Sequence, residues 1–150
     1  MTARRLRIGL GAAAVALALL STQLPWARAE AACANTGAEL QFGAGPTAAG
    51  WAALFLAGIA VTQIAGLIPG AGVRYVGLGA GVVALVAVVW GLGIDNRTAF
   101  EAFRPTSSGG AVGVLCHFDP AAGYWTALAS CVLTLGAGLA VLRTGGPAWR

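Results

Sequence analysis

Long apolar segments separated by short polar segments dominate this sequence. The clearest segment, residues 75–94 (YVGLGAGVVALVAVVWGLGI), has no charged residue and is bounded by Arg74 and Asp95. A helix of twenty residues is ~30 Å long at ~1.5 Å per residue, which is the thickness of a bilayer's hydrocarbon core. The pattern therefore predicts a transmembrane helix over residues 75–94.

Three further apolar segments have similar lengths, and Gly and Pro residues mark the connections between them. These segments cover about residues 8–27, 48–68 and 121–142. The connection at 69–74 is short, so the helices on either side of it are expected to form an antiparallel hairpin. We predict an all-α fold in which the whole chain is one domain of four antiparallel transmembrane helices.

The composition supports the membrane class. Hydrophobic residues make up 58% and charged residues 9% of the chain, against about 45–50% and about 25% in soluble domains. The net charge of +4 comes from arginine alone, and the arginines are scattered rather than gathered with aromatic residues on a basic face. The expected partner is the lipid bilayer, and no nucleic acid is expected.

The distribution of charge orients the predicted bundle. With a cytoplasmic N-terminus, the arginines on the inner side are Arg4, Arg5, Arg7, Arg74, Arg143 and Arg150. Those on the outer side are Arg28, Arg97 and Arg104. This bias follows the positive-inside rule. The lack of lysine and the abundance of Ala, Gly, Val and Leu suggest a GC-rich bacterial genome. We therefore expect a multi-pass protein of the bacterial cytoplasmic (inner) membrane, with both termini cytoplasmic and outer loops at 28–47 and 95–120.

Tryptophan positions give independent support for this topology. Trp26, Trp51, Trp90 and Trp125 all fall at the outer ends of predicted spans. An indole ring is favoured at the boundary between lipid and water. The four residues therefore predict an aromatic belt at the outer interface.

The first apolar segment also fits a secretory signal peptide. Basic residues precede a short apolar core at 8–20, and Ala27-Arg28-Ala29 fits the small-x-small pattern of a cleavage site. Cleavage before Glu30 leaves three spans with unchanged orientations. Pro25 and Trp26 favour the alternative, an uncleaved helix that ends at the outer interface.

The cysteine positions predict a disulfide. Cys33 lies in the first outer loop and Cys116 in the second, so both share an oxidising compartment. Their bond would join the two loops across the bundle. Cys131 lies within the fourth span and is interpreted as a packing residue.

The sequence contains no recognisable catalytic, cofactor-binding or metal-binding motif. His117 follows Cys116 and precedes Asp119, but zinc needs three or four ligands at defined spacing. A thiol-redox enzyme of the four-helix type is expected to carry a C-x-x-C pair, which is missing. No enzyme activity, cofactor or metal is therefore expected.

Polar residues within the spans are few and not ionisable. Thr126, Ser130 and Thr134 recur every four residues and share one helix face. Such hydroxyls bond their own backbone or a neighbouring helix, or they line a polar path. The second span adds Thr62 and Gln63.

Residues 95–120 form the largest polar segment. Within it, residues 98–104 (TAFEAFR) are predicted as a short amphipathic helix on the outer surface, with Phe100 and Phe103 on one side. Residues 107–110 are predicted as a linker. This segment is the best candidate for recognition of another protein.

Short motifs near the span ends resemble a known family. These are an Arg-rich start, Leu24-Pro25-Trp26, Gly123-Tyr124-Trp125 and Trp149-Arg150. The layout resembles small actinobacterial four-span proteins of the tryptophan-operon-associated membrane protein type. That resemblance implies a four-span fold and no particular activity.

Three functional hypotheses follow. The first is a non-enzymatic accessory or structural membrane protein that acts through helix packing and the 95–120 loop, with other membrane proteins as partners. The second is a small oligomeric transporter or channel that uses the hydroxyl face of the fourth span. The third is a thiol-redox protein of the outer face, which requires a reactive Cys116.

Overall fold

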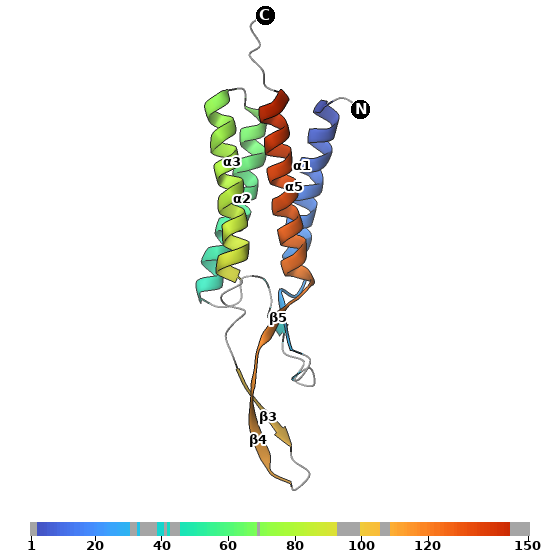
Figure 1. Cartoon of the computed structure of the whole chain (residues 1–150), viewed down its shortest axis with the longest axis vertical. Helices are drawn as coiled ribbons and strands as arrows, with labels where there is room; N and C mark the ends of the chain where they lie inside the picture. Colours follow the sequence, from blue (N-terminus) through green and yellow to red (C-terminus); the bar gives the residue numbers. More distant parts are fainter. Residues whose placement is uncertain are drawn as a thin grey trace, which may run out of the picture.

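The computed structural model of the chain consists of a helical bundle with small β-sheets beyond one end (Figure 1). It describes residues 3–30, 33, 39–40, 42, 46–68, 70–92, 100–105 and 109–144. Helix α1 begins, α5 ends and α2 joins α3 at one end of the bundle, which we call the terminal end (Figure 1). The strands lie at the opposite end, which we call the strand end.

Most of the described chain is helical. The helices are α1 (Ala3–Ser21), α2 (Pro46–Leu67), α3 (Ala71–Val86), the π-helical turn η2 (Ala87–Leu92) and α5 (Ala122–Thr144). In the described residues, three segments are long and apolar enough to cross a membrane: Ala49–Leu67, Gly72–Trp90 and Ala122–Ala140. Helix α1 has a shorter apolar stretch, Ile8–Ser21.

The helix boundaries differ from the predicted spans at two places. Helix α1 ends at Ser21, so the first apolar segment is helical only in part. Helix α3 begins at Ala71, after Gly70 with a φ of 140°, and therefore contains Arg74 in its first turns. A long arginine side chain extends to water from within a helix end, so Arg74 does not terminate the helix.

Helices α2 and α3 form the predicted antiparallel hairpin and pack closely through small residues (Figure 1). A Cβ atom on Gly58 would lie 2.6 Å from the Ala80 carbonyl oxygen. The Thr62 hydroxyl lies 2.8 Å from the Gly77 carbonyl oxygen across the interface. Glycine at these positions therefore allows the two backbones to approach.

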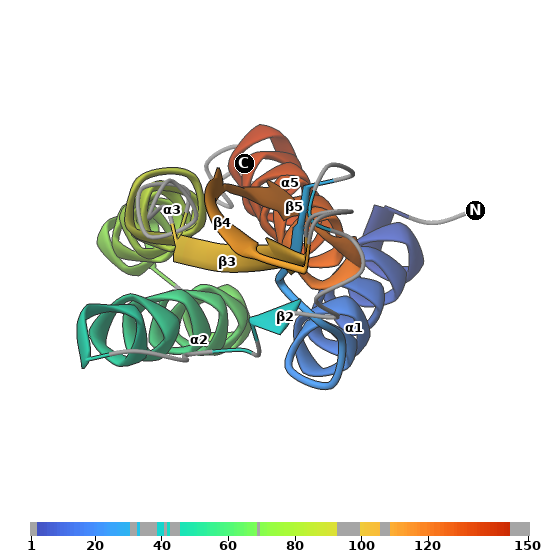
Figure 2. The same cartoon turned by 90° about the horizontal axis from the view of Figure 1, so that it is seen from below.

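Helices α1 and α5 form a second closely packed pair (Figure 2). Ala14 and Ala127 are buried in the bundle. The Ser130 hydroxyl donates a hydrogen bond of 2.7 Å to the Ala14 carbonyl oxygen. Helix α5 also contacts α3, so it links the two pairs.

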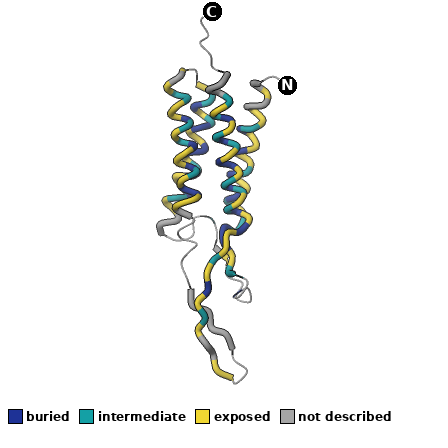
Figure 3. The backbone as a smooth tube through the Cα atoms, in the orientation of Figure 1, coloured by how far each residue is buried: buried dark blue, intermediate teal, exposed yellow. Residues whose placement is uncertain are grey.

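The bundle buries few large side chains, and many of its large apolar side chains are exposed instead. Exposed positions run along the outside of each helix (Figure 3). The main apolar cluster lies toward the strand end. It includes five aromatic residues, Trp26, Phe42, Trp51, Phe55 and Tyr124. The exposed apolar exterior of the helices is typical of a surface that faces lipid rather than water.

The prediction of an all-α fold is confirmed only in part: the described chain is mostly helical, but strands occupy parts of both predicted outer loops. The strands are β1 (Ala27–Ala29), β2 (Glu39–Leu40), β3 (Phe100–Pro105), β4 (Ala111–Cys116) and β5 (Phe118–Pro120). One antiparallel sheet has the order β2-β1-β5, and the other pairs β3 with β4.

The predicted surface helix at 98–104 is wrong over residues 100–104, and residues 98–99 lie outside the described part of the chain. Residues 100–105 form strand β3, which pairs with β4 from Phe100 opposite Cys116 to Pro105 opposite Ala111. The spacing of Phe100 and Phe103 fits a helix, but a seven-residue helix is too short to be stable alone. Pairing with β4 satisfies the backbone groups on the edge of β3 that faces β4.

Candidate functional site

The predicted disulfide is present and links the two segments that were predicted as outer loops. Cys33 and Cys116 are bonded, with their Cα atoms 6.0 Å apart and a sequence separation of 83. Cys33 is 4% exposed and Cys116 is fully buried, and both pack against Ala29 and Val114. Because the bond is enclosed by protein, it has the character of a structural bridge rather than an accessible redox centre.

The chain after α1 runs beside the chain before α5. The Ala121 amide donates to the Trp26 carbonyl oxygen and the Gly123 amide to that of Pro25, each at 2.9 Å. A Cβ atom on Gly123 would lie 2.8 Å from the Leu24 carbonyl oxygen and 2.7 Å from the Trp26 ring, so only glycine fits there. These contacts join Leu24-Pro25-Trp26 to Gly123-Tyr124-Trp125.

The same pairing continues through the small sheet. Strand β1 lies between β2 and β5, with Arg28 opposite Glu39 on one side and Asp119 on the other. Arg28 and Glu39 form an exposed salt bridge of 2.9 Å. The Glu30 amide donates to the His117 carbonyl oxygen at 2.9 Å. Residues 27–30 are therefore built into the strand end.

The β3–β4 hairpin extends from this base, away from the helices (Figure 1). Its strand β4 ends at Cys116, so the disulfide holds the hairpin at its root. In β4, Val114 faces the disulfide, whereas Leu115 points outward and is 60% exposed. In the described residues neither strand has a second neighbour, so each has one unpaired edge.

The tryptophans predicted as an interface belt occupy different environments. Trp90 and Trp125 are exposed, with 64% and 57% of their surface accessible. Trp51 is partly buried and packs against the core cluster. Trp26 is only 2% exposed, and its Nε1 donates to the Ser21 carbonyl oxygen at 2.7 Å. Trp26 is thus a packing residue of the bundle.

The aromatic residues around Trp26 close the strand end of the bundle. The Trp26 ring lies 5.1 Å from that of Phe42, 6.2 Å from that of Phe55 and 6.5 Å from that of Tyr124, centroid to centroid. These spacings are those of favourable tilted and edge-on aromatic pairs. The cluster fixes the base of the hairpin to the helices.

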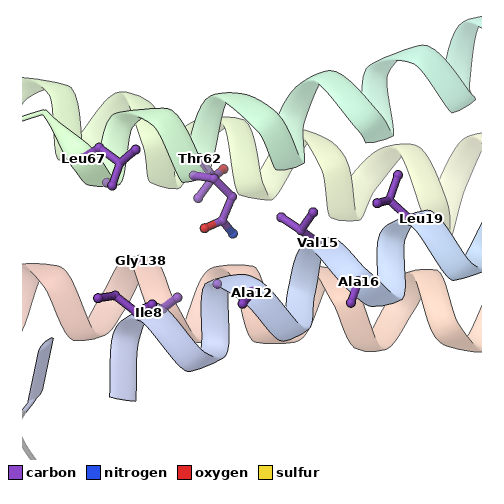
Figure 4. A pocket seen from close by; sticks show the side chains of 12 residues that line it. Ile8, Ala12, Val15, Ala16, Leu19, Thr62, Leu67 and Gly138 are labelled. Carbon is purple, nitrogen blue, oxygen red and sulfur yellow. The ribbon is translucent and has the colours of Figure 1, made fainter. Parts of the chain in front are cut away.

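A groove of about 800 Å³ separates α1 from α2 (Figure 4). Ile8, Ala12, Val15 and Leu19 line it along α1. Thr62, Gln63 and Leu67 line the opposite wall on α2, while Ala137 and Gly138 of α5 also border it. Ile8, Leu19 and Leu67 are all exposed, so the groove opens to the side of the bundle.

Gln63 is the main polar group of this groove. Its Oε1 lies 2.6 Å from the position of a Cβ atom on residue 11, so Gly11 allows the amide to reach α1. Its Nε2 is enclosed and has no hydrogen-bond acceptor in the described part of the chain. An amide donor left without a partner in an apolar surrounding costs about 1–3 kcal/mol.

The hydroxyl face predicted for the fourth span lies largely inside the bundle. Thr126 donates to carbonyl oxygens of its own helix at 2.9 Å, and Ser130 donates to Ala14 of α1. Thr134 is fully buried, and its hydroxyl has no partner among the described residues. Two of the three hydroxyls therefore act in helix stability and packing.

The other polar candidates do not converge. His117 and Asp119 are exposed on adjacent parts of the strand end, and Cys131 is buried in α5 as an unpaired thiol. Within the described residues no group of three His, Cys, Asp or Glu side chains is close enough to hold a metal ion.

Sequence reasoning did not identify the groove or the hairpin. The alternation in Ala111–Cys116, with Val112 and Val114 on one side, is a strand signal, and Gly109 and Gly110 before it are a turn signal. Gln63 is noticeable as an amide in an apolar helix, but its position opposite Gly11 depends on packing between helices distant in sequence.

Comparison with known proteins adds no relative. No family model, no curated protein and no solved structure matches this chain.

Proposed function

We propose that this chain is a four-span protein of the bacterial cytoplasmic membrane that presents the β3–β4 hairpin on the outer side as a docking element for a partner protein. It is a non-enzymatic accessory protein in this proposal. The observation that carries the proposal is a hairpin fixed at its root by a buried disulfide and extended beyond the helices (Figure 1).

The hairpin has the properties of a recognition element. Two-stranded hairpins are marginally stable alone, so a covalent anchor at the root is needed to hold one in place. An unpaired strand edge offers backbone donors and acceptors to an extended segment of another protein. Leu115 adds an exposed apolar contact beside that edge.

The arginine bias and the disulfide both support an orientation with the terminal end in the cytoplasm and the strand end outside. The strand end contains the disulfide, which forms in an oxidising compartment. The inner arginines predicted from the sequence lie toward the termini and in α3 near its start. A cytoplasmic terminal end satisfies both conditions.

Helix α1 is proposed to remain as the first span. Its apolar stretch, Ile8–Ser21, extends ~20 Å at ~1.5 Å per residue, which is shorter than the ~30 Å hydrocarbon core, and the chain from there to Trp26 is proposed to complete the crossing. The suggested cleavage site at 27–29 is strand β1, which is paired on both sides. Cleavage would remove the central strand and the helix that packs on α5.

The test is co-purification of the partner from membranes after mild detergent extraction. Leu115→Glu places a charge on the exposed apolar position of the hairpin, and His117→Glu is the matched control two residues away, also exposed. We expect the first change to reduce recovery of the partner about tenfold, which corresponds to ~1.4 kcal/mol. Equal recovery with both variants, or a chain that purifies alone, would overturn the proposal.

The other two hypotheses have less support from the geometry. A transporter or channel would need the α5 hydroxyls to line a path, whereas Thr126 and Ser130 bond to helix backbone. A redox protein would need an accessible Cys116, which is fully buried. Flux assays in liposomes, and alkylation of the unreduced protein, test these two hypotheses directly.

A further inference from the structure

The α1–α2 groove is an open, largely apolar space that no described part of the chain fills. Helices α1 and α2 make few contacts, although each packs closely on another helix. A space of about 800 Å³ remains between them, open to the side (Figure 4). In a membrane such a space is filled by lipid or by another helix.

The length of the groove matches one lipid leaflet. Its α1 wall runs from Ile8 to Leu19, and eleven helical steps of ~1.5 Å give ~16 Å. Half of the ~30 Å hydrocarbon core is ~15 Å. An acyl chain is much thinner than a helix ~10 Å across, so it can lie within the groove between α1 and α2.

Gln63 supplies a polar contact at a suitable depth. It lies four residues before the end of α2, and therefore ~6 Å from the terminal end of that helix. Rotation about its terminal torsion exchanges Oε1 with Nε2, so the amide donor can face the groove. A lipid ester carbonyl at this depth would accept the hydrogen bond that Nε2 lacks.

Positive charge lies at the terminal end of the groove. Arg5 is exposed and precedes Ile8 by three residues, so it continues the face of α1 that lines the groove. Arg74 lines a small hollow that shares Thr62, Gly66 and Gly138 with the groove. A phosphate group at this end would be attracted to both guanidinium groups.

We infer that the α1–α2 groove binds one anionic glycerophospholipid from the leaflet at the terminal end. The acyl chain lies between Ile8 and Leu19, an ester carbonyl accepts from Gln63, and the phosphate lies near Arg5. This inference rests on the membrane placement proposed above but not on the docking role of the hairpin.

The test is native mass spectrometry of the full chain in mild detergent with equal amounts of dioleoyl phosphatidylglycerol and dioleoyl phosphatidylcholine. We expect one phosphatidylglycerol to stay bound after other lipids are removed. Ala12→Phe fills the groove and should reduce this bound fraction at least tenfold. Ala13→Phe is the matched control, because Ala13 is exposed but does not line the groove.

Two further variants separate the contacts. Gln63→Leu should weaken the binding of both lipids several-fold. Arg5→Gln should remove the preference for phosphatidylglycerol over phosphatidylcholine. Formation of the disulfide, seen on a non-reducing gel, verifies that each variant folds.

Three results would overturn the inference. They are no retained lipid on the unaltered chain, equal retention in Ala12→Phe and Ala13→Phe, and a dimer that Ala12→Phe abolishes, since a second copy would then occupy the groove. Extraction of the chain by alkaline carbonate would instead overturn the membrane placement on which the inference rests. Failure of lipid binding in a carbonate-resistant chain overturns the inference alone.

Discussion

Gly58→Ala should destabilise the protein by separating α2 from α3. The added Cβ would lie 2.6 Å from the Ala80 carbonyl oxygen, 2.8 Å from the Ala84 Cβ and 3.1 Å from the Ala84 amide nitrogen. Two of these atoms belong to the backbone of α3, so a side-chain rotation does not relieve the contact. The helices must move apart by several tenths of an ångström.

Two effects of Gly58→Ala lower the free energy of unfolding: the added methyl group overpacks the interface, and the helix shift weakens the contact from Thr62 to Gly77. Insertion of a methyl group into a close-packed interface costs about 1–3 kcal/mol. The shift also lengthens the 2.8 Å contact from the Thr62 hydroxyl to Gly77, and a hydrogen bond between membrane helices is worth about 0.6 kcal/mol. We therefore expect a loss of about 1–3 kcal/mol in the free energy of unfolding.

The assay is reversible unfolding in mixed micelles, with helix content measured against the mole fraction of a denaturing detergent. Gly50→Ala is the matched control, because Gly50 lies on the same helix with nothing within 4 Å of its added Cβ. Helix propensity alone should make that variant equal to or up to ~1 kcal/mol more stable than the unaltered chain. Equal stability of the two variants would refute the close approach of α2 and α3.

Three more substitutions test other contacts. Cys33→Ser should speed proteolysis of the hairpin and lower stability by at most about 4–5 kcal/mol, the loop entropy of an 83-residue separation, whereas Cys131→Ser should leave proteolysis unchanged. Ser130→Ala should cost about 0.6 and at most about 1.7 kcal/mol in the same unfolding assay, because it removes one bond between helices. Trp26→Phe should cost about 0.5–1.5 kcal/mol through its lost hydrogen bond, whereas Trp125→Phe, at an exposed site, should cost less.

Hydropathy was sufficient to predict the apolar helices, because a long uncharged segment has one stable conformation in lipid. Residues 48–68 and 121–142 correspond closely to α2 and α5, and the short link after α2 correctly predicted the hairpin with α3. The Cys33–Cys116 bond was predictable because the topology assigned both thiols to one compartment.

The strand end was not predictable, because its pairing is non-local. Residues 27–29 are too few to show an alternating pattern, and their partners at 118–120 are distant in sequence. The inward position of Trp26 was not predictable for the same reason, because its ring packs on Tyr124, which is distant in sequence. At 100–105 a helical spacing of phenylalanines competed with strand pairing, and the partner strand determined the outcome.

The groove exists because of the way the α1–α5 pair and the α2–α3 pair are arranged side by side. Amino-acid composition does not specify that arrangement. Gly11 and Gln63 meet because α1 packs on α5 and α2 packs on α3, leaving the α1–α2 side open. Small residues at regular spacing occur on every helix of this chain, so their spacing alone does not select these pairs.

Labelling of single introduced cysteines in intact cells tests whether the chain is a membrane bundle with its strand end outside the cytoplasm. Gln23→Cys is exposed at the strand end and Gly72→Cys is exposed at the terminal end. With a membrane-impermeant maleimide, we expect labelling of residue 23 in intact cells and of residue 72 only after permeabilisation. Labelling of residue 72 in intact cells, with residue 23 protected, would show that the strand end is cytoplasmic.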